Sequence, residues 1–280
     1  MILQAVLILG GIGLVFGVCI ALANRRLWVW EDPRIDAVAG MLPNVNCGAC
    51  GLPGCRAFAE QTVEGKIAPA ECTVADAGVR QAIADYLGVD AGQAVKRVAR
   101  LLCAGGSDVA PARAEYRGLA TCAAAAAVAG GGKGCTWGCL GLADCERACD
   151  FEAIVMGETG LPVVIPEKCT ACGDCVDACP KELFVVLPLE YPLLVQCRNL
   201  VGGDAALEQC RVACNACGKC VQDAAPGLIS VASGVAVVDY GRIGEATAAA
   251  VARCPTGAIV WLAGGAQFEQ TPALAQREAA

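Results

Sequence analysis

The chain begins with one long apolar segment and continues with much shorter ones. Residues 1–23 contain no charged side chain and only one strongly polar one. A helix of about 20 apolar residues spans a hydrocarbon core of about 30 Å, whereas a signal peptide would place a basic segment before a shorter apolar one. Arg25 and Arg26 follow the segment, which by the positive-inside rule keeps the next residues in the cytoplasm. We predict a single transmembrane helix over residues 1–24 in the cell inner membrane, with the body on the cytoplasmic side and Cys19 as an apolar helix residue.

Beyond this segment the hydrophobic pattern predicts short helices and strands. Asp32 before Pro33 is an N-cap and N1 pair, so a helix is expected over residues 33–42, and residues 56–65 predict one amphipathic helix. Residues 75–130 are rich in alanine and glycine and are mostly helical in pattern. Short β-branched or apolar stretches, expected to form small hairpins, lie at 153–156, 163–165 and 183–187.

The composition limits how such short elements can be stabilised. Apolar residues make up 56% of the chain but aromatic residues only 5%, and the chain has 21 cysteines and no histidine. Metal–thiolate bonds are therefore expected to replace part of the core. The absence of histidine excludes Rieske ligation and catalysis through an imidazole. The formal charge of −7, without any basic run, gives no support to a nucleic-acid partner.

The densest cysteine motif is Cys169-x2-Cys172-x2-Cys175-x3-Cys179-Pro180. This spacing wraps a [4Fe–4S] cluster, and in two-cluster ferredoxins the fourth thiolate crosses to the neighbouring cluster. A zinc site would need only two CxxC pairs and no Cys-Pro ending, and disulfides are not expected in a cytosolic body. The motif therefore predicts a ferredoxin-like module.

A related motif precedes it, Cys135-x3-Cys139-x5-Cys145-x3-Cys149, in which Leu142 stands where the middle ligand would be. The repeat supports a pair of clusters. By the crossing rule, the predicted ligands are Cys149, Cys169, Cys172 and Cys175 for one cluster, and Cys135, Cys139, Cys145 and Cys179 for the other.

Two further motifs flank this pair. Nearer the N-terminus, a C-x2-C-x4-C-x16-C set predicts a cluster of different architecture, with a zinc knuckle as the alternative. After residue 190 the ferredoxin pattern recurs, but Ala224 occupies the place of its fourth cysteine. The predicted ligands are Cys47, Cys50, Cys55 and Cys72 for the first of these sites, and Cys214, Cys217, Cys220 and Cys254 for the second.

Four cysteines remain, namely Cys103, Cys122, Cys197 and Cys210. They lie at matching places ahead of the two ferredoxin-like halves. A fifth cluster and a set of reduced structural thiols are both consistent with this arrangement. The expected cofactors are three to five [4Fe–4S] clusters.

The expected fold is α+β, with an N-terminal transmembrane helix, a small helical [4Fe–4S] domain and tandem ferredoxin-like modules. The predicted boundaries are a transmembrane helix over 1–24, the N-terminal [4Fe–4S] domain over 25–90, a linker or helical segment over 91–134, a two-cluster ferredoxin-like domain over 135–190, a degenerate second one over 191–264, and a tail over 265–280.

Several motifs occur together along nearly the whole chain: WEDPR at 30–34, NCGACGLPGC at 46–55, KGCTWGCLGLADC at 133–145, GLPVV at 160–164 and KCTACGDC at 168–175. In this combination the chain resembles the B subunit of the Rnf electron-transport complex. The resemblance implies a membrane-bound, ion-translocating ferredoxin:NAD oxidoreductase, coupled to Na⁺ or H⁺. In it this subunit would pass low-potential electrons between ferredoxin and the other subunits.

The same resemblance implies that the 47–72 cysteine set is the family's N-terminal cluster domain and that the 135–179 set is its ferredoxin domain. This chain also departs from the family pattern in one place. Long members of the family would carry a complete cysteine set near residues 243–254, where this chain has Ile243, Ala246 and Ala249. One cluster is therefore expected to be lost.

Two other functions stay open at this stage. The chain could be the ferredoxin-like subunit of a membrane hydrogenase or formate dehydrogenase, although the 46–55 loop beside the membrane anchor disfavours this. It could also be a membrane-tethered metal or redox sensor, although the density of cysteine motifs favours electron transfer. No GxGxxG opens a helix after a strand, so NAD chemistry is expected on a partner.

Overall fold

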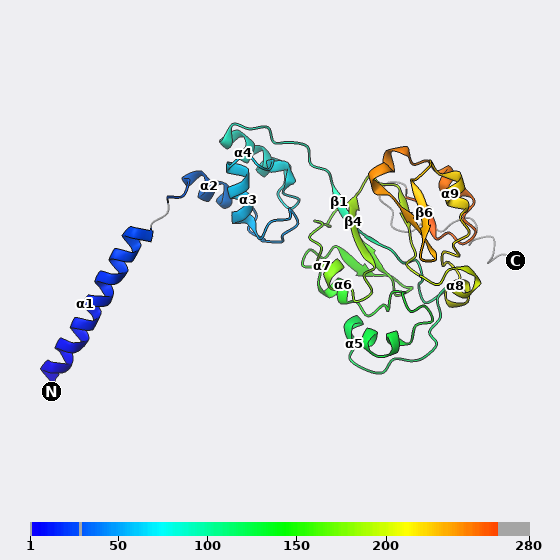
Figure 1. Cartoon of the computed structure of the whole chain (residues 1–280), viewed down its shortest axis with the longest axis horizontal. Coiled ribbons are helices and arrows are strands. Elements are labelled where there is room, and N and C mark those ends of the chain that lie inside the picture. Colours follow the sequence, from blue (N-terminus) through cyan, green and yellow to red (C-terminus); the bar gives the residue numbers. More distant parts are fainter. Residues whose placement is uncertain (1, 28–29, 263–280) are drawn as a thin grey trace.

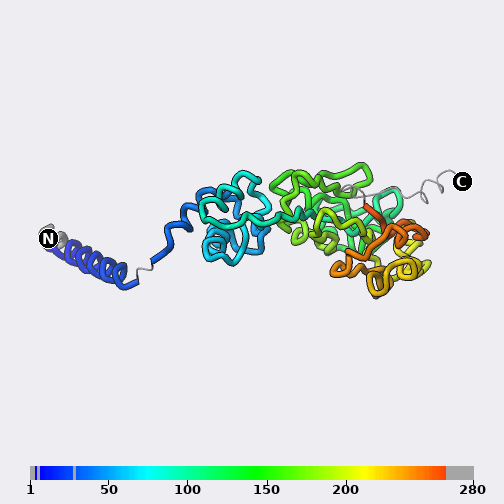
Figure 2. The backbone as a smooth tube through the Cα atoms, turned by 90° about the horizontal axis from the view of Figure 1, so that it is seen from above, coloured from blue at the N-terminus to red at the C-terminus, as the bar shows by residue number. Residues whose placement is uncertain are grey.

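The computed structural model describes residues 2–27 and 30–262 of the chain. The parts follow one another along one long axis (Figures 1 and 2). Helix α1 (Ile2–Leu27) comes first, then a small helical domain, and then a larger body that contains the strands. The α+β class is thus confirmed, whereas the predicted tail over 265–280 lies outside the described residues.

Helix α1 is exposed over its apolar segment Leu7–Leu27. Its segment Leu7–Leu27 has a mean hydropathy of 2.3 and buries no side chain against the rest of the protein. Within the described residues it is the one helix long and apolar enough to cross a membrane, and Arg25 and Arg26 lie in its last turn. Its length and composition fit the predicted span.

Three α-helices and a 3₁₀ turn form the small domain. They are α2 (Pro33–Met41), α3 (Cys55–Val63), η1 (Pro69–Glu71) and α4 (Ala77–Leu87). The predicted cap of α2 is confirmed, because the Asp32 side chain accepts a hydrogen bond from the Arg34 amide. Val38, Phe58 and Ile83 are fully buried or nearly so and hold the helices together. This core fixes the loop that leads into α3.

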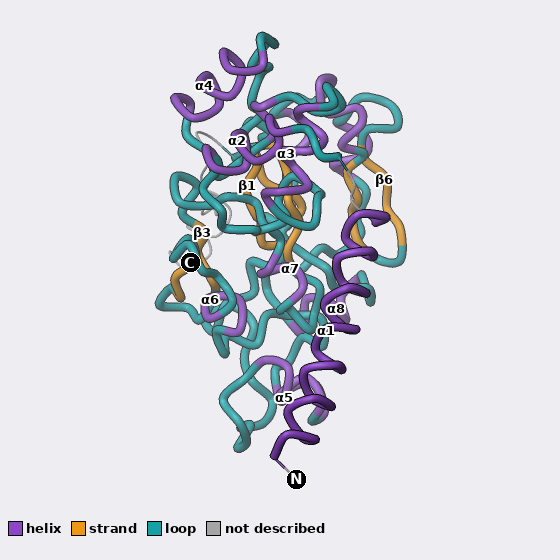
Figure 3. Tube along the Cα trace, turned by 90° about the vertical axis from the view of Figure 1, so that its left-hand side faces the viewer, coloured by secondary structure: helices purple, strands orange, loops and turns teal. Residues whose placement is uncertain are grey.

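The body is built from four small antiparallel sheets and many loops (Figure 3). Each sheet has two strands. The pairs are β1 (Arg97–Leu101) with β4 (Phe184–Pro188), β2 (Ile154–Met156) with β3 (Pro162–Val164), β5 (Leu193–Val195) with β8 (Ile259–Trp261), and β6 (Ile229–Ala232) with β7 (Val235–Val238).

Short helices connect these strands, and most have one or two turns. They are α5 (Cys122–Ala127), η2 (Ala129–Gly132), α6 (Asp144–Arg147), α7 (Asp174–Asp177), α8 (Gly203–Gln209), α9 (Lys219–Asp223), η3 (Tyr240–Glu245) and α10 (Ala249–Ala252). Cysteines are part of the main buried cluster of the body, beside apolar side chains such as Leu101 and Leu183.

The prediction that residues 75–130 are mostly helical is wrong, because residues 88–121, between α4 and α5, contain no helix. Residues 97–101 form β1, which pairs with β4 from far along the sequence, Leu101 lying opposite Phe184. Four of the five β1 residues are buried, including Arg100. A strand buried on both faces has no alternating pattern, so its period could not distinguish it from a helix.

Candidate iron-sulfur centres

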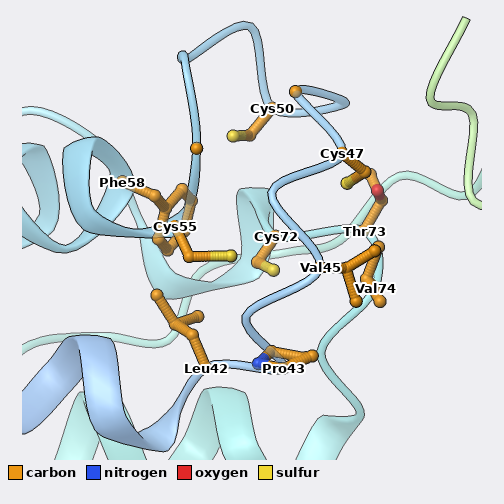
Figure 4. Close-up of a pocket in the computed structure, with 12 residues that line it drawn as sticks. Leu42, Pro43, Val45, Cys47, Cys50, Cys55, Phe58, Cys72, Thr73 and Val74 are labelled. Atoms are coloured by element: carbon orange, nitrogen blue, oxygen red, sulfur yellow. The ribbon is translucent and has the colours of Figure 1, made fainter.

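The N-terminal site lies in the loop before α3. Cys47, Cys50, Cys55 and Cys72 line one cavity of about 350 Å³, and their sulfur atoms point toward the same space (Figure 4). Leu42 and Phe58 line its apolar wall. The structure therefore brings together the four cysteines predicted for this site.

Asn46 fixes the turn that places Cys55. Its Oδ1 accepts a hydrogen bond of 2.9 Å from the Cys55 amide. Gly54 has φ +130°, and a Cβ there would lie 2.7 Å from that oxygen. Only glycine fits this conformation and this contact, so the NCGACGLPGC motif is a packed loop with a defined shape.

Two cysteine loops in the body share one backbone conformation. In Cys169–Gly173 the left-handed residues are Ala171 (φ +62°) and Gly173 (φ +99°). In the 214–218 loop they are Ala216 (φ +57°) and Gly218 (φ +71°), at the same positions. A short helix, α7 or α9, begins directly after each loop. This common geometry supports the predicted internal duplication.

The first loop gathers the thiols of one predicted set. Burial, together with the neighbouring thiols of Cys169, Cys172, Cys145 and Cys149, raises the pKa of Cys175 to about 12. Backbone amides point at two of these sulfur atoms, since Ala99 donates to Cys169 Sγ (3.5 Å) and Ala153 donates to Cys149 Sγ (3.3 Å). Amides aimed at sulfur favour the thiolate, which is the form that binds metal.

The second predicted set differs from the structure in one member. Cys139, Cys145 and Cys179 line a cavity of about 370 Å³, but the fourth cysteine there is Cys122 and not Cys135. Cys122 begins α5, whose N-cap is Thr121. The amide of Ala123 donates a 2.9 Å hydrogen bond to Asp144, which begins α6 and precedes Cys145. This contact holds Cys122 beside Cys145.

Cys135 is directed elsewhere by a run of glycines. Gly130, Gly131 and Gly132 all have positive φ, and a Cβ on Gly132 would lie 2.3 Å from the Ala114 carbonyl oxygen. The chain therefore turns sharply just before Cys135. The predicted grouping of Cys135 with Cys139 rested on spacing along the chain, which does not show this turn.

Cys135 completes a further site with three of the four remaining cysteines. Cys103, Cys135, Cys197 and Cys210 line a cavity of about 320 Å³. The buried Asn199 lies against it, with its Nδ2 3.6 Å from Cys135 Sγ. From the sequence, the four cysteines without an assigned site included Cys122 and not Cys135, and whether they bind a fifth cluster stayed open.

This site lies next to two others. The Cys139 amide donates to Cys103 Sγ (3.5 Å), and the Cys214 amide donates to Cys197 Sγ (3.3 Å). A residue of each neighbouring site thus contacts a sulfur of this one. The site joins the two ferredoxin-like halves.

The last predicted set is also brought together. Cys214, Cys217, Cys220 and Cys254 line a cavity of about 360 Å³. Ala224, Ile243 and Ala246, which stand where further ligands were expected, pack against the apolar core of this half.

The comparisons with known proteins match two regions of the chain to iron–sulfur families. Residues 42–74 match a protein family described as an Fe-S cluster domain, and residues 134–184 match the 4Fe-4S dicluster domain family. The B subunit of the Na⁺-translocating ferredoxin:NAD⁺ oxidoreductase complex of Acetobacterium woodii is 45% identical over 92% of this chain and 77% of its own length. The B subunit of the proton-translocating ferredoxin:NAD⁺ oxidoreductase complex of Clostridium ljungdahlii is 35% identical over 92% of this chain and 92% of its own length. The B subunit of the ion-translocating oxidoreductase complex of Methanosarcina acetivorans is 35% identical over 92% of this chain and 97% of its own length.

The chain belongs to this B-subunit family. Membership makes it an iron–sulfur electron-transfer subunit of a multi-subunit, membrane-associated oxidoreductase complex, as the motifs predicted. It favours this function over the hydrogenase, formate dehydrogenase and sensor alternatives.

The residues of this family member fit iron–sulfur clusters in their donor chemistry and spacing. All 21 cysteines are free thiols. In the part of the chain that the structure describes, no three Cys, Asp or Glu side chains converge on a point where one bare ion could bind. The thiols instead stand around cavities of 320–370 Å³. A group of several atoms suits that arrangement, whereas tetrahedral zinc holds its sulfur ligands at about 2.3 Å from one centre.

Proposed function

We propose that the chain holds five [4Fe–4S] clusters, each on four cysteines. The observation that carries this proposal is the gathering of sixteen thiols into four sets of four around cavities of similar volume. The fifth set is supported by the closeness of the Cys169, Cys172 and Cys149 thiols to Cys175. With Cys19 in α1, these sets account for all 21 cysteines. The proposed ligand sets are Cys47, Cys50, Cys55 and Cys72; Cys149, Cys169, Cys172 and Cys175; Cys122, Cys139, Cys145 and Cys179; Cys103, Cys135, Cys197 and Cys210; and Cys214, Cys217, Cys220 and Cys254.

Contacts between neighbouring sites support one order of electron transfer. The Cys214 amide contacts Cys197, and the Cys139 amide contacts Cys103. Cys145 in turn is among the thiols that raise the pKa of Cys175. The order along the body is then the Cys214 site, the Cys103 site, the Cys122 site and the Cys149 site, with the N-terminal site nearest the membrane helix.

In this proposal the body lies on the cytoplasmic side of the cell inner membrane. A reduced ferredoxin supplies low-potential electrons to the body, and the N-terminal site passes them to membrane subunits. NAD is reduced on a partner subunit. The coupling ion is Na⁺ or H⁺, since the relatives named above include a Na⁺-translocating and a proton-translocating complex.

The chemistry needs no acid, base or substrate pocket in this chain. When bound, the clusters supply reversible one-electron transfer at low potential. The protein supplies the thiolates and shields most of them from water. Eleven of the proposed ligands are partly buried, and eight are buried, namely Cys103, Cys135, Cys139, Cys145, Cys169, Cys175, Cys210 and Cys220. The protein also donates amides to sulfur, as Ala153 does to Cys149. Such donors and the exclusion of solvent set the potentials of iron–sulfur centres.

The direct test is the metal content of the full chain purified without oxygen. Iron, acid-labile sulfide and zinc would be measured per polypeptide, and a reductive titration would be followed by electron paramagnetic resonance. Five clusters of four irons correspond to about 20 irons per chain, and four clusters to about 16. About 20 irons with signals only at low potential would support the proposal. Stoichiometric zinc with little iron would overturn it.

A further inference from the structure

Lys133 stands between two of the proposed cluster sites. Its Nζ donates hydrogen bonds to the carbonyl oxygens of Gly105 and of Cys139, the second at 2.7 Å. Gly105 lines the Cys103 cavity, and Cys139 lines the Cys122 cavity. The ammonium group therefore joins the walls of both sites.

The charge of Lys133 is not neutralised by a nearby carboxylate. Within residues 2–27 and 30–262, Lys133 forms no ion pair, whereas Lys66 and Lys168 pair with Glu64 and Glu152. Lys133 is also half-buried, so solvent screens its charge less than that of an exposed lysine. Its electrostatic neighbours are thus carbonyl groups and thiols.

Ligands of both sites lie close to this charge. Cys139, whose carbonyl oxygen accepts from Lys133, belongs to one site. Cys135, two residues after Lys133, belongs to the other. One cation therefore lies beside the thiols of two sites.

We propose that Lys133 is a positioning residue that raises the reduction potentials of the Cys103 and Cys122 centres together, through its charge and through the two loops that it joins. This inference rests on the proposed function. Each centre, when it holds a cluster, gains one electron from the reduced ferredoxin of that proposal and becomes more negative by one charge. A fixed cation close by favours the reduced form. One cation between the two centres therefore shifts both potentials in the same direction.

The test compares the reduction potentials of loaded, full-length variants. Lys133→Gln removes the charge but keeps a donor for the carbonyl groups, and Lys133→Arg keeps the charge. Lys168→Gln is the matched control, because it removes the same charge from an exposed, ion-paired lysine. Each protein is titrated anaerobically and followed by electron paramagnetic resonance, after its iron content has been measured.

We expect Lys133→Gln to lower the ratio of reduced to oxidised centre roughly tenfold at a fixed potential, which is about 59 mV for one electron. Two centres should shift, Lys133→Arg should restore most of the shift, and Lys168→Gln should leave both potentials unchanged. Full iron loading with unchanged potentials in Lys133→Gln would overturn the inference. If Lys133→Gln loses iron, Lys133→Arg decides: wild-type potentials support a role for the charge, and shifted potentials with full iron contradict it.

The proposed function and this inference fail in different ways. A wild-type chain without about 20 irons would contradict the five-cluster proposal before any potential is measured. Unchanged potentials in a fully loaded Lys133→Gln protein would contradict only the role of Lys133.

Discussion

The two ferredoxin-like halves of the body have the same loop geometry but different contents. The first half combines the Cys149 and Cys122 sites around a core that includes Leu101 and Leu183. The second half keeps one complete set, the Cys214 site. In place of the other set it has an apolar cluster around Leu228 and Ile229. The first half is thus organised around two sets of thiols, whereas the second is organised around one set of thiols and an apolar core.

The difference shows how a cluster site can be lost without losing the module. Ile243 and Ala246 pack against the remaining core, and Tyr240 stacks on Tyr191 with ring centres 5.8 Å apart. Apolar burial of this kind stabilises a fold by roughly 25 cal/mol per Å². A thiol set stabilises the fold only when its metal is bound. The first half should therefore depend on iron more strongly than the second.

The largest effect is expected from removing a ligand in the first half. Cys172→Ala should lose about four irons per chain and destabilise its module, because metal binding and folding are coupled there. Cys19→Ala is the control, since Cys19 lies exposed on α1, away from every proposed site. Iron content and thermal unfolding measured without oxygen would check both. A Cys172→Ala protein with full iron and unchanged electron transfer would contradict the assignment.

Paired cysteine substitutions test which thiols share a site. The structure places Cys122 and Cys139 around one cavity and Cys135 around another. The double variant Cys122→Ala/Cys139→Ala should therefore lose about four irons, and Cys135→Ala/Cys139→Ala about eight. The grouping by sequence spacing predicts the reverse if Cys122 binds a fifth cluster, and a loss of about four irons in both variants if Cys122 is a structural thiol. A loss of only about four irons in Cys135→Ala/Cys139→Ala would therefore contradict the arrangement in the structure.

The second half should respond most to its apolar core. Leu228 is fully buried, and Leu228→Ala should cost about 2–5 kcal/mol of stability while leaving the iron content unchanged. Val237→Ala is the matched control, because Val237 is 44% exposed on the neighbouring strand. Unfolding would be followed in the anaerobic, iron-loaded chain. If Leu228→Ala also lost iron from the first half, the two halves would not be stabilised independently, and the comparison would fail.

Local sequence signals predicted much of this architecture. The Asp32 cap, the helix over 55–63, the short strands after each cysteine motif and the tight Cys169-x2-Cys172-x2-Cys175 spacing are each decided within a few residues. The long-range partners were not predictable in this way. Cys122 reaches Cys145 through the cap at Thr121 and a hydrogen bond to Asp144, and β1 reaches β4 across most of the first half. The positive φ values of the glycines before Cys135, which redirect that cysteine, have no periodic pattern.

The smallest effect concerns the surface of the second half. Arg253 donates two hydrogen bonds to Asp223, and these lower the pKa of that carboxyl group and tie the end of α10 to the end of α9. Arg253 is exposed and Asp223 is partly exposed, so the pair adds little stability, and salt screens it further. Arg253→Gln should lower the unfolding temperature of the iron-loaded chain less than Leu228→Ala does, and the difference from wild type should shrink in about 1 M salt. A shift as large as that of Leu228→Ala would mean that the link between α9 and α10, and not the apolar core, holds this half together.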